Sequence, residues 1–409
     1  MPANSFRAAP VAPAEGPSLI GLAALTRKAM RGEDLAPVAR SLLARLAADP
    51  RDAAALLDLS TIEQLLSASV NRISLQSQAL DLTRIYREGA ANENAPTLLI
   101  LVAQGDFMAN TPVEFLLEGA NIQTAFLYID AEMDILAAAP PHAAAFVAVA
   151  ESAANQPILA AIAAVASRWP APLLNAPEAI ARLTREGSWR LLHDAPGVIY
   201  PRNRLLSREQ ILLGEGAEDF PFIIRPVDSH AGVGLEKIED EPGLSAYLRN
   251  HDEAFFTTAP YIDYRGPDRL FRKMRIAMVD GAPWPAHLAV SPRWMIHYLN
   301  ADMVENADNR AEEALFMANF QQFAQRHAET FAHIHERLQL DYFLIDCAEM
   351  HESQLLIFEV GSAMVAHDFD CPQIFPYKSA PMRRLFDAFQ QMILSRVEGG
   401  WVAPPGEPA

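Results

Sequence analysis

The segment PFIIRPVDSHAGVGLEK, residues 221–237, carries the pattern on which the interpretation of this chain depends. An apolar run ends at Arg225, a loop of small residues with Gly232 and Gly234 follows, and a return strand bears Lys237. Glycine lets backbone N–H groups approach an anion closely, so such a loop can close over a phosphate chain. Two glycines alone more often form a plain hairpin. The two flanking cations, in a chain with only four lysines, favour phosphate binding.

Two later apolar segments each carry one carboxylate. The first, DYFLIDCA from residue 341, includes Asp346, and the second, LLIFEVG from residue 355, includes Glu359. Neighbouring antiparallel strands can present two such side chains side by side on one face. A Mg²⁺ ion that bridges nucleotide phosphates is usually held by one or two carboxylates together with water and phosphate oxygens. We therefore predict that the pair binds Mg²⁺, although either acid taken alone is more simply explained as facing solvent.

Upstream of these segments, buried strands alternate with helices. The continuous apolar run at 98–102 is typical of a parallel strand, and further strands are predicted at 125–129 and 146–149, with a helix at 156–168. This alternation predicts a βαβ layer domain over residues 95–175. Its glycine loop has neither the dinucleotide-binding nor the P-loop spacing, so neither of those sites is expected there.

The N-terminal part of the chain has a different texture. Residues 1–17 are predicted to be a flexible leader, and residues 18–94 show helical periodicity. Within it, 35–88 resembles one and a half tetratricopeptide-type hairpins, too few for a peptide groove. We expect a cap that packs on the main body; the alternative, that it holds a partner or shapes the acceptor site, stays open. The tail, 397–409, is predicted to be flexible.

Composition narrows the class of protein. The chain has 409 residues, 51% hydrophobic and 21% charged, which predicts a globular protein of two to three domains. The net charge of −18 disfavours binding to nucleic acid or to an anionic membrane. The chain has two cysteines and no apolar run typical of a signal peptide or a membrane span, so a cytoplasmic protein is expected.

In their order, these motifs resemble the ATP-grasp superfamily, most closely the glutathione-synthetase-like carboxylate–amine ligases. The resemblance covers roughly residues 97–390, and its motifs are specific only in combination. It implies an α/β and α+β fold in which the βαβ pre-domain precedes a two-lobed ATP-grasp domain, here residues 176–396. The two lobes of such a domain clamp ATP between them.

The resemblance also implies the residues that bind the nucleotide. Arg225 stands where the family usually has lysine, the glycine loop is its lid, and Tyr261 lies in the segment similar to the adenine hinge. Asp263 becomes a candidate ribose ligand. The full predicted ATP-binding set is Arg185, Arg225, Ser229, His230, Gly232, Gly234, Lys237, Tyr261 and Asp263.

The strand FRKMRIAMVDG, residues 271–281, is similar to a family strand in which an arginine precedes apolar residues and a glycine. The resemblance implies that Arg275 is catalytic and stabilises the transferred phosphoryl group, with Lys273 beside it. The chain also departs from the family in two places. Gly361 stands where the family usually has asparagine as a further metal ligand, and the lysine expected near the start of the ATP-binding domain is missing.

A polar and aromatic cluster follows that strand. We predict that it faces the substrate, although histidines that are buried and hydrogen-bonded within the core explain it equally well. The predicted substrate residues are His287, Arg293, His297, Tyr298 and His367.

Together, these features predict an enzyme: an ADP-forming ligase that uses ATP and Mg²⁺ to activate a carboxylate as an acyl-phosphate and joins it to an amine. The expected partners are small-molecule or peptide substrates, and assembly into a homo-oligomer stays open. Two alternatives remain. One is a degenerate nucleotide-binding regulatory protein without turnover, and the other is a kinase-like phosphoryl transferase on the same frame.

Overall fold

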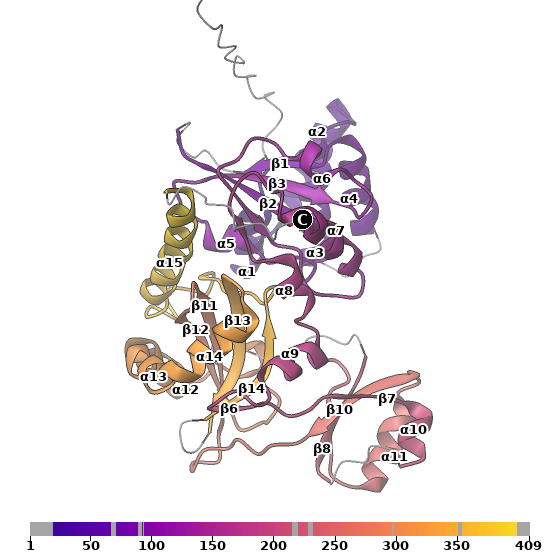
Figure 1. Cartoon of the computed structure of the whole chain (residues 1–409), viewed down its shortest axis with the longest axis vertical. Helices are drawn as coiled ribbons and strands as arrows, with labels where there is room; N and C mark the ends of the chain where they lie inside the picture. The colour runs from indigo at the N-terminus through magenta and orange to yellow at the C-terminus, as the bar shows by residue number, and fades with distance from the viewer. Residues whose placement is uncertain are drawn as a thin grey trace, which may run out of the picture.

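The computed structural model describes residues 19–66, 71–88, 92, 94–214, 220–227, 232–296, 298–350 and 354–398. The predicted leader and nearly all of the predicted tail lie outside these ranges, as do Ser229, His230 and His297. The described part is a mixed α/β structure (Figure 1), as predicted. None of the helices in these ranges combines the length and apolar character that crossing a membrane requires.

The N-terminal segment is helical, as predicted. Its helices are α1 (Leu22–Met30), α2 (Ala36–Ala48), α3 (Ala53–Leu66) and α4 (Asn71–Leu82). They enclose a small core of their own, which includes Leu25, Leu42 and Ile62. Leu56 and Leu57 of α3 belong instead to the core of the neighbouring sheet, so the segment is packed on the body of the protein. Its likeness to tetratricopeptide hairpins stays a prediction.

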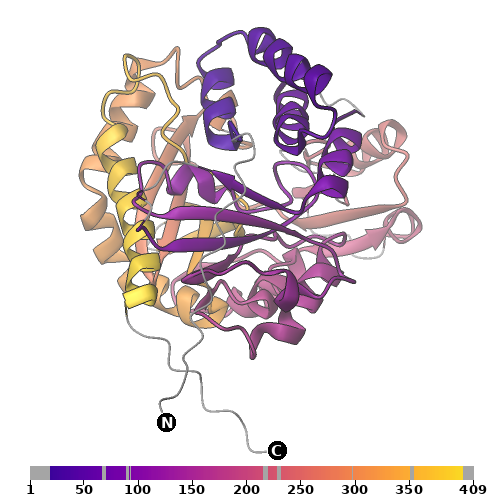
Figure 2. The ribbon, with the colours of Figure 1, turned by 90° about the horizontal axis from the view of Figure 1, so that it is seen from above.

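The first sheet is largely parallel. Its strands are β1 (Ile85–Glu88), β2 (Thr97–Ala103), β3 (Gln123–Ile129), β4 (Ala144–Val147) and β5 (Leu173–Leu174), in the order β1-β3-β2-β4-β5. Figure 2 shows the helical segment on one side of this sheet and later helices on the other, among them α7 (Gln156–Ala166). Both faces of β2 are therefore buried, which explains its uninterrupted apolar run. The predicted βαβ layer is confirmed.

Strand β1 was not predicted, because the sequence interpretation assigned its residues to the helical segment. It pairs antiparallel with β3 at the edge of the sheet. Its four residues include the charged Arg87 and Glu88, and only Tyr86 is fully buried. Such a short and polar edge strand has no apolar alternation by which it could be recognised.

The second sheet forms a small lobe. Its strands are β7 (Arg204–Ser207), β8 (Phe222–Pro226), β9 (Glu236–Ile238) and β10 (Phe255–Pro260), in the order β7-β10-β8-β9, with α10 (Arg208–Leu212) and α11 (Glu241–Asn250) packed on it. The predicted glycine-loop hairpin is confirmed, since Ile223 of β8 pairs with Lys237 of β9. The lobe has a separate core built around Ile224, Tyr247 and Phe256.

The third sheet forms a large lobe. Its strands are β6 (Val198–Ile199), β11 (Phe271–Val279), β12 (Ala282–Ser291), β13 (Tyr342–Glu349) and β14 (Leu355–Gly361), in the order β12-β11-β13-β14-β6. The later helices are α12 (Ala307–Ala318), α13 (Phe320–Arg326), α14 (Ala328–Leu338) and α15 (Ser379–Glu398). The shorter helices are α5 (Val113–Leu116), α6 (Ile135–Ala138), α8 (Pro177–Ala181), α9 (Arg185–Leu192) and the 3₁₀ turn η1 (Tyr298–Asn300).

The parallel sheet and the large lobe share their hydrophobic cores. Phe389 of α15 packs edge-on against Phe146 of β4 and Tyr342 of β13, at ring-centroid distances of 5.6 and 5.1 Å. Asn175, just after β5, is fully buried and has a positive φ of 55°. Its side chain exchanges two hydrogen bonds of 2.8 Å with the backbone of Tyr342, and its N–H donates to Asp341. These contacts fasten the end of one sheet to the start of β13.

Acidic side chains gather where the helical segment meets the parallel sheet. Asp58 of α3, Glu88 of β1 and Glu114 of α5 line a small cavity together with Tyr86 and Tyr128. Burial raises the pKa of Asp58 to about 6. It also raises the pKa values of Glu88 and Glu114 above the ordinary range. The folded protein therefore binds protons at these acids more tightly than the unfolded chain does.

We predict that this contact is weaker in alkaline solution. Because the folded-state pKa values lie above the unfolded value of about 4, the stabilisation is complete below that pH. It is lost as the pH rises through about 6 for Asp58 and about 7 for Glu114. Thermal unfolding at pH 5 and pH 8 should show the difference. Glu114→Gln should reduce the pH dependence by on the order of 1–3 kcal/mol, whereas Glu132→Gln, at an exposed acid, should not. An identical pH dependence in both variants would contradict the assignment.

Candidate functional site

The centre of the site is a buried ion group on adjacent strands of the large lobe. Arg275 of β11 lies opposite Asp346 of β13. The Arg275 Nε and Nη2 atoms donate to Asp346 Oδ1 and Oδ2 at 2.7 and 2.9 Å, and Lys273 Nζ lies 2.7 Å from Oδ2. Asp346 is only 1% exposed. Both predicted catalytic cations thus contact the predicted metal ligand, an arrangement that the sequence interpretation did not foresee.

The charges of this group stabilise one another. Burial alone would raise the pKa of Asp346, but attraction by Arg275 and then Lys273 holds that pKa well below its usual range. Burial alone would lower the pKa of Arg275, and attraction by Asp346 reverses the direction. The carboxylate and the guanidinium therefore both stay charged at neutral pH.

Glu359 of β14 lies directly opposite Asp346, so the predicted juxtaposition of the two carboxylates is confirmed. Glu359 is exposed, whereas Asp346 is buried. Among the described residues, Asp346 Oδ1 accepts one hydrogen bond, from Arg275, which leaves it a lone pair. The described residues contain no group of three or more His, Cys, Asp or Glu side chains arranged to hold a metal. Gly361, at the end of β14, offers no side chain.

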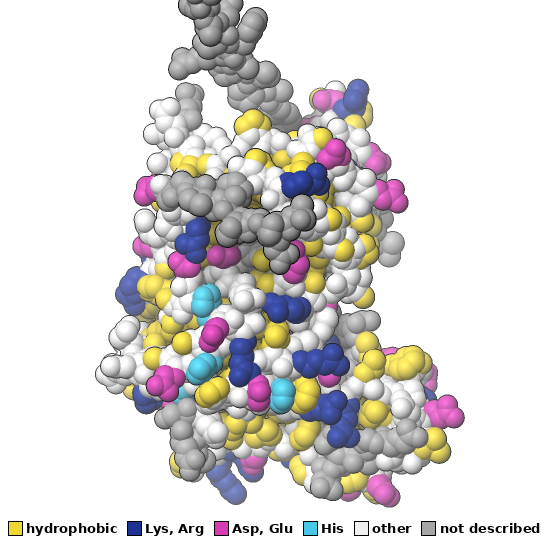
Figure 3. All heavy atoms as spheres, viewed as in Figure 1, with side chains coloured by type: hydrophobic (Ala, Val, Ile, Leu, Met, Phe, Trp, Pro, Cys, Tyr) yellow, Lys and Arg dark blue, Asp and Glu magenta, His cyan; other side chains and the backbone are white. Residues whose placement is uncertain are grey.

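Two further predicted phosphate-binding cations, Arg225 and Arg185, interact with each other, and Arg225 also interacts with Glu359. Burial and then repulsion by Arg185 lower the pKa of Arg225 to about 10, while attraction by Glu359 opposes the shift. Arg225 comes from β8 of the small lobe and Arg185 from the first residue of α9. Figure 3 shows basic side chains gathered on this face, over α9 and toward the small lobe. Residues from both lobes therefore share one electrostatic environment.

The hairpin and hinge residues lie in the small lobe and just beyond it. Gly232 and Gly234 have positive φ angles of 75° and 66°. A Cβ atom at Gly234 would lie 2.7 Å from the ring of Pro226, so this position requires glycine. Lys237 Nζ lies 4.0 Å from the ring centroid of Tyr261, which brings these two predicted residues together.

Asp263, the predicted ribose ligand, has another partner. Its carboxylate pairs with the guanidinium of Arg265, whose hydrogen bonds hold the pKa of Asp263 below the usual value. Both side chains lie near the surface. A ribose contact at Asp263 therefore stays a prediction.

A small cavity lies beside Arg275, and we call it the substrate cavity after the residues that the sequence interpretation predicted to face the substrate. Its lining residues are Ala286, His287, Tyr298, Val365, Ala366, His367, Asp370 and Lys378. His287 is the strand partner of Arg275, which places the cavity next to the ion group. Three of the predicted substrate residues therefore line one cavity. Arg293 does not: it is exposed, donates to the carbonyl of Asn300 and lies 3.6 Å from Asp302. His297 lies outside the described residues.

The histidines of the substrate cavity are neutral. Burial, followed by repulsion from Arg275, lowers the pKa of His287 well below its ordinary value. Burial lowers the pKa of His367 to about 4. A neutral imidazole offers one hydrogen-bond donor and one acceptor and adds no charge to the cavity.

Sequence reasoning missed the residues that hold the cavity lining in place by hydrogen bonds. Glu313 of α12 has no exposed surface and accepts hydrogen bonds from Tyr298 at 3.0 Å and Tyr377 at 2.6 Å. Lys378 donates to the Tyr298 hydroxyl and to Asp370, both at 2.6 Å. The Tyr298 hydroxyl therefore donates to the carboxylate of Glu313 and accepts from the amino group of Lys378. Its ring lies 4.7 Å from that of His287.

A signal for this network is present in the sequence. Asn309, Glu313 and Met317 form the buried stripe of α12 at a spacing of four. Polar residues on the buried face of a helix need hydrogen-bond partners, so they mark an internal network. Lys378 is one of only four lysines in the chain, but nothing near it in the sequence identified Tyr298 and Asp370 as its partners.

Comparison with known proteins finds similarity only to solved structures. No family model matches the chain, and no curated protein is recognisably similar to it in sequence. Similar solved structures include a RimK-domain ATP-grasp protein from Sphaerobacter thermophilus, with 16% identity and a TM-score of 0.42 over 73% of this chain and 99% of that one.

Two ligase structures are among the other solved structures to which the chain is similar. D-alanine–D-alanine ligase from Bacillus anthracis, complexed with ATP, has 13% identity and a TM-score of 0.45 over 75% of this chain and all of that one. The ATP-grasp ligase PsnB, complexed with a precursor peptide and AMPPNP, has 13% identity and a TM-score of 0.42 over 75% and 99%. At TM-scores below 0.5, these matches carry no argument about the fold or the substrates of this chain.

We predict that Asp346→Asn destabilises the protein by about 3–5 kcal/mol, because it leaves Lys273 and Arg275 largely buried without a counter-charge. Glu359→Gln, at the exposed strand partner, should change the free energy of unfolding by about 0.5 kcal/mol or less. Urea denaturation of the two variants beside the wild type tests this difference. Equal stability of the two variants would show that the ion group has no structural role.

Proposed function

We propose that the protein is an ATP-dependent ligase that activates a carboxylate as an acyl-phosphate and joins it to an amine. The observation that carries this proposal is the buried group of Lys273, Arg275 and Asp346. It adjoins Glu359 on one side and the substrate cavity, through His287, on the other. Transfer of a phosphoryl group requires fixed cations between the nucleotide and the acceptor, and this group occupies such a place in the proposal.

In the proposal, the nucleotide phosphates lie between the lobes. Arg225 and Lys237 of the small lobe, with Arg185, supply positive charge in an otherwise acidic protein. Charge-assisted contacts to phosphate oxygens are the strongest hydrogen bonds available there. The backbone at Gly232 and Gly234 can come close to the phosphates because no side chain intervenes.

In the proposal, a single Mg²⁺ ion lies at Glu359, which offers an exposed carboxylate. Asp346 is buried and already paired with Lys273 and Arg275, so it contributes to the ion only through the remaining lone pair on Oδ1. Mg²⁺ commonly takes one or two carboxylates and fills its other positions with water and phosphate oxygens, so the absence of a side chain at Gly361 is tolerable. When bound, the ion would neutralise the charge on the phosphate oxygens.

The chemistry proposed for the substrate cavity has two steps. The substrate carboxylate attacks the γ-phosphorus and releases ADP, and an amine then attacks the acyl-phosphate and releases phosphate. Arg275 and Lys273 stabilise the negative charge of the transferred group. His287 and His367, which stay neutral, orient the substrates by hydrogen bonds, while Asp370 and Lys378 offer one charge of each sign.

We expect hydroxylamine to trap the activated intermediate. Hydroxylamine is a small amine that converts an acyl-phosphate into a hydroxamate, so the natural amine need not be known. The protein is incubated with ATP, Mg²⁺, hydroxylamine and pools of amino acids or short peptides, and ADP and hydroxamate are measured. The proposal predicts equal amounts of both, dependent on the added carboxylate.

Other outcomes identify the alternatives. ADP formed without hydroxamate would favour a kinase-like phosphoryl transferase. Binding of ATP without any ADP would favour the degenerate nucleotide-binding protein, in which Gly361 has replaced a needed ligand. Either result would contradict the ligase.

Arg225→Ala should weaken ATP binding by about 1.5–3 kcal/mol, because it removes a charge-assisted phosphate contact. That corresponds to a roughly 10- to 150-fold higher dissociation constant in calorimetric titration. Arg225→Lys, which restores the residue usual in the family, should bind ATP nearly as well as the wild type. Arg249→Ala serves as the control, since it removes an exposed arginine from the same lobe. An unchanged affinity in Arg225→Ala would refute the phosphate contact.

A further inference from the structure

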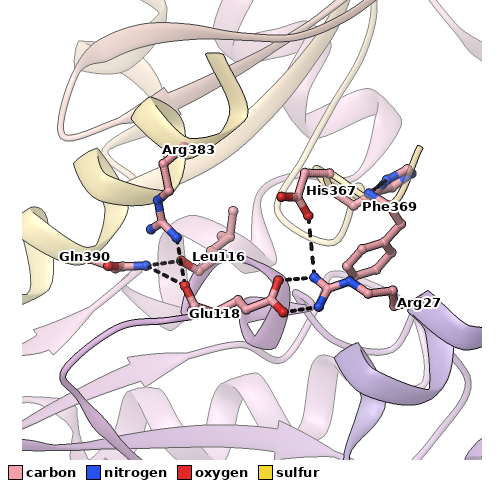
Figure 4. Close-up of polar contacts among 8 residues, drawn as sticks. Arg27, Leu116, Glu118, His367, Phe369, Arg383 and Gln390 are labelled. Carbon is pink, nitrogen blue, oxygen red and sulfur yellow. Dashed lines mark hydrogen bonds and ion pairs between the residues drawn. The ribbon is translucent and has the colours of Figure 1, made fainter. Parts of the chain in front are cut away.

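Arg27 connects the N-terminal helical segment to two other parts of the chain (Figure 4). Both terminal nitrogens of its guanidinium contact the carboxylate of Glu118, and Nη2 lies 3.5 Å from Asp368. The guanidinium also lies 4.8 Å from the ring centroid of Phe369. The Arg27 side chain is 24% exposed, so this contact is largely shielded from solvent.

Glu118 is the fixed end of this contact. It follows α5, and its carbonyl accepts hydrogen bonds from Arg383 at 2.9 Å and Gln390 at 3.4 Å, both on α15 (Figure 4). Helix α15 belongs to the shared core of the parallel sheet and the large lobe. The body of the protein therefore holds Glu118, and Arg27 can use it as an anchor.

Asp368 and Phe369 lie at the other end of the contact, on a segment without regular secondary structure. They belong to the connection between β14 and α15, which has no regular secondary structure over 364–369. We call the first part of this connection, residues 362–370, the cavity loop. Val365, His367 and Asp370 of this loop line the substrate cavity. Position of the loop therefore determines the shape of one wall of the cavity.

The effect of Arg27 reaches the cavity through stacked side chains. The rings of His367 and Phe369 stack at a centroid distance of 5.2 Å, and the backbone N–H of Phe369 donates to His367 Nδ1 at 3.2 Å. On the inner side, Arg275 Nη1 donates to the carbonyl of Val365 at 3.0 Å. The loop is thus held between the ion group of the candidate active site and a helix more than 200 residues earlier in the chain.

Of the two cations that act on Asp368, Arg27 has the larger effect and Arg383 the smaller. Burial, with repulsion from Glu118, raises the pKa of Asp368, and attraction by Arg27 opposes that shift. Without the guanidinium, two carboxylates would face each other across a partly buried gap. Loss of Arg27 would replace attraction by repulsion and push the loop away from Glu118.

We propose that Arg27 is a positioning residue for the substrate cavity, and that the helical segment holds the cavity loop in place. In this proposal the segment is more than a stabilising cap, because it shapes the site where the acceptor binds. The assignment of the cavity to a substrate rests on the proposed function. The positioning of the loop by Arg27 does not, and it can be tested without substrate.

The test compares Arg27→Met with Arg45→Met in the full-length protein. Arg45 pairs with Asp52 inside the helical segment, so its loss removes an ion pair there without touching the cavity loop. Hydrogen–deuterium exchange should be at least tenfold faster at residues 362–370 in Arg27→Met than in the wild type. The pKa of His367 by nuclear magnetic resonance, with His367→Gln for assignment, should rise from about 4 toward 6.5. Arg45→Met should leave both measurements unchanged.

Two further variants keep the test decisive. Arg27→Asn/Glu118→Gln/Asp368→Asn, which removes the repulsion as well as the attraction, should restore slower exchange in the loop. Arg27→Lys keeps the charge and should lie between the wild type and Arg27→Met, even if the latter folds poorly. The proposal would be overturned if folded Arg27→Lys and Arg27→Met both exchanged hydrogen at residues 362–370 as slowly as the wild type. It would also be overturned if Arg45→Met accelerated exchange in the cavity loop as much as Arg27→Met does.

The hydroxamate assay then separates this proposal from the proposed function. In Arg27→Met, the KM for the carboxylate should rise while the dissociation constant for ATP stays unchanged, because the phosphate-binding residues lie elsewhere. Absence of hydroxamate in the wild type would remove the ligase but leave the exchange result standing. A raised dissociation constant for ATP with an unaltered loop would remove the positioning role.

Discussion

The candidate site depends on one buried carboxylate. Asp346 lies between Lys273 and Arg275 and keeps both cations in place on β11. A desolvated carboxylate is unfavourable unless it is paired, and the bidentate contact with Arg275 makes the pairing directional as well as attractive. Arg275 in turn donates to the carbonyl of Val365, so the same group fixes one side of the cavity loop. Charge, strand register and cavity shape are therefore linked through Asp346.

Much of the fold could be predicted from the sequence because hydrophobic runs mark buried strands. The strand at 97–103 is an uninterrupted apolar run after Thr97, and the strand at 342–349 is apolar apart from its two acids. Short elements could not be predicted in this way. β1 and β6 have few residues, and they join their sheets through partners that are distant in sequence.

The candidate site could be predicted in part. Residue type and order pointed to Arg275, Asp346 and Glu359, and the structure confirms that they are neighbours on adjacent strands. Their interactions were not foreseen, because pairing of Asp346 with two cations depends on the register of the strands. Glu313 was missed for the same reason: its partners come from η1 and from the segment before α15.

The shared cores of the parallel sheet and the large lobe have a mechanical consequence. Residues of both sheets belong to the same hydrophobic clusters, and Asn175 fastens one sheet to the other, whereas the small lobe encloses its own core. A rotation between the two larger parts would break close packing, which is costly, whereas the small lobe can turn without disturbing it. Packing therefore favours movement of the small lobe, which carries Arg225, relative to one larger unit that carries Glu359.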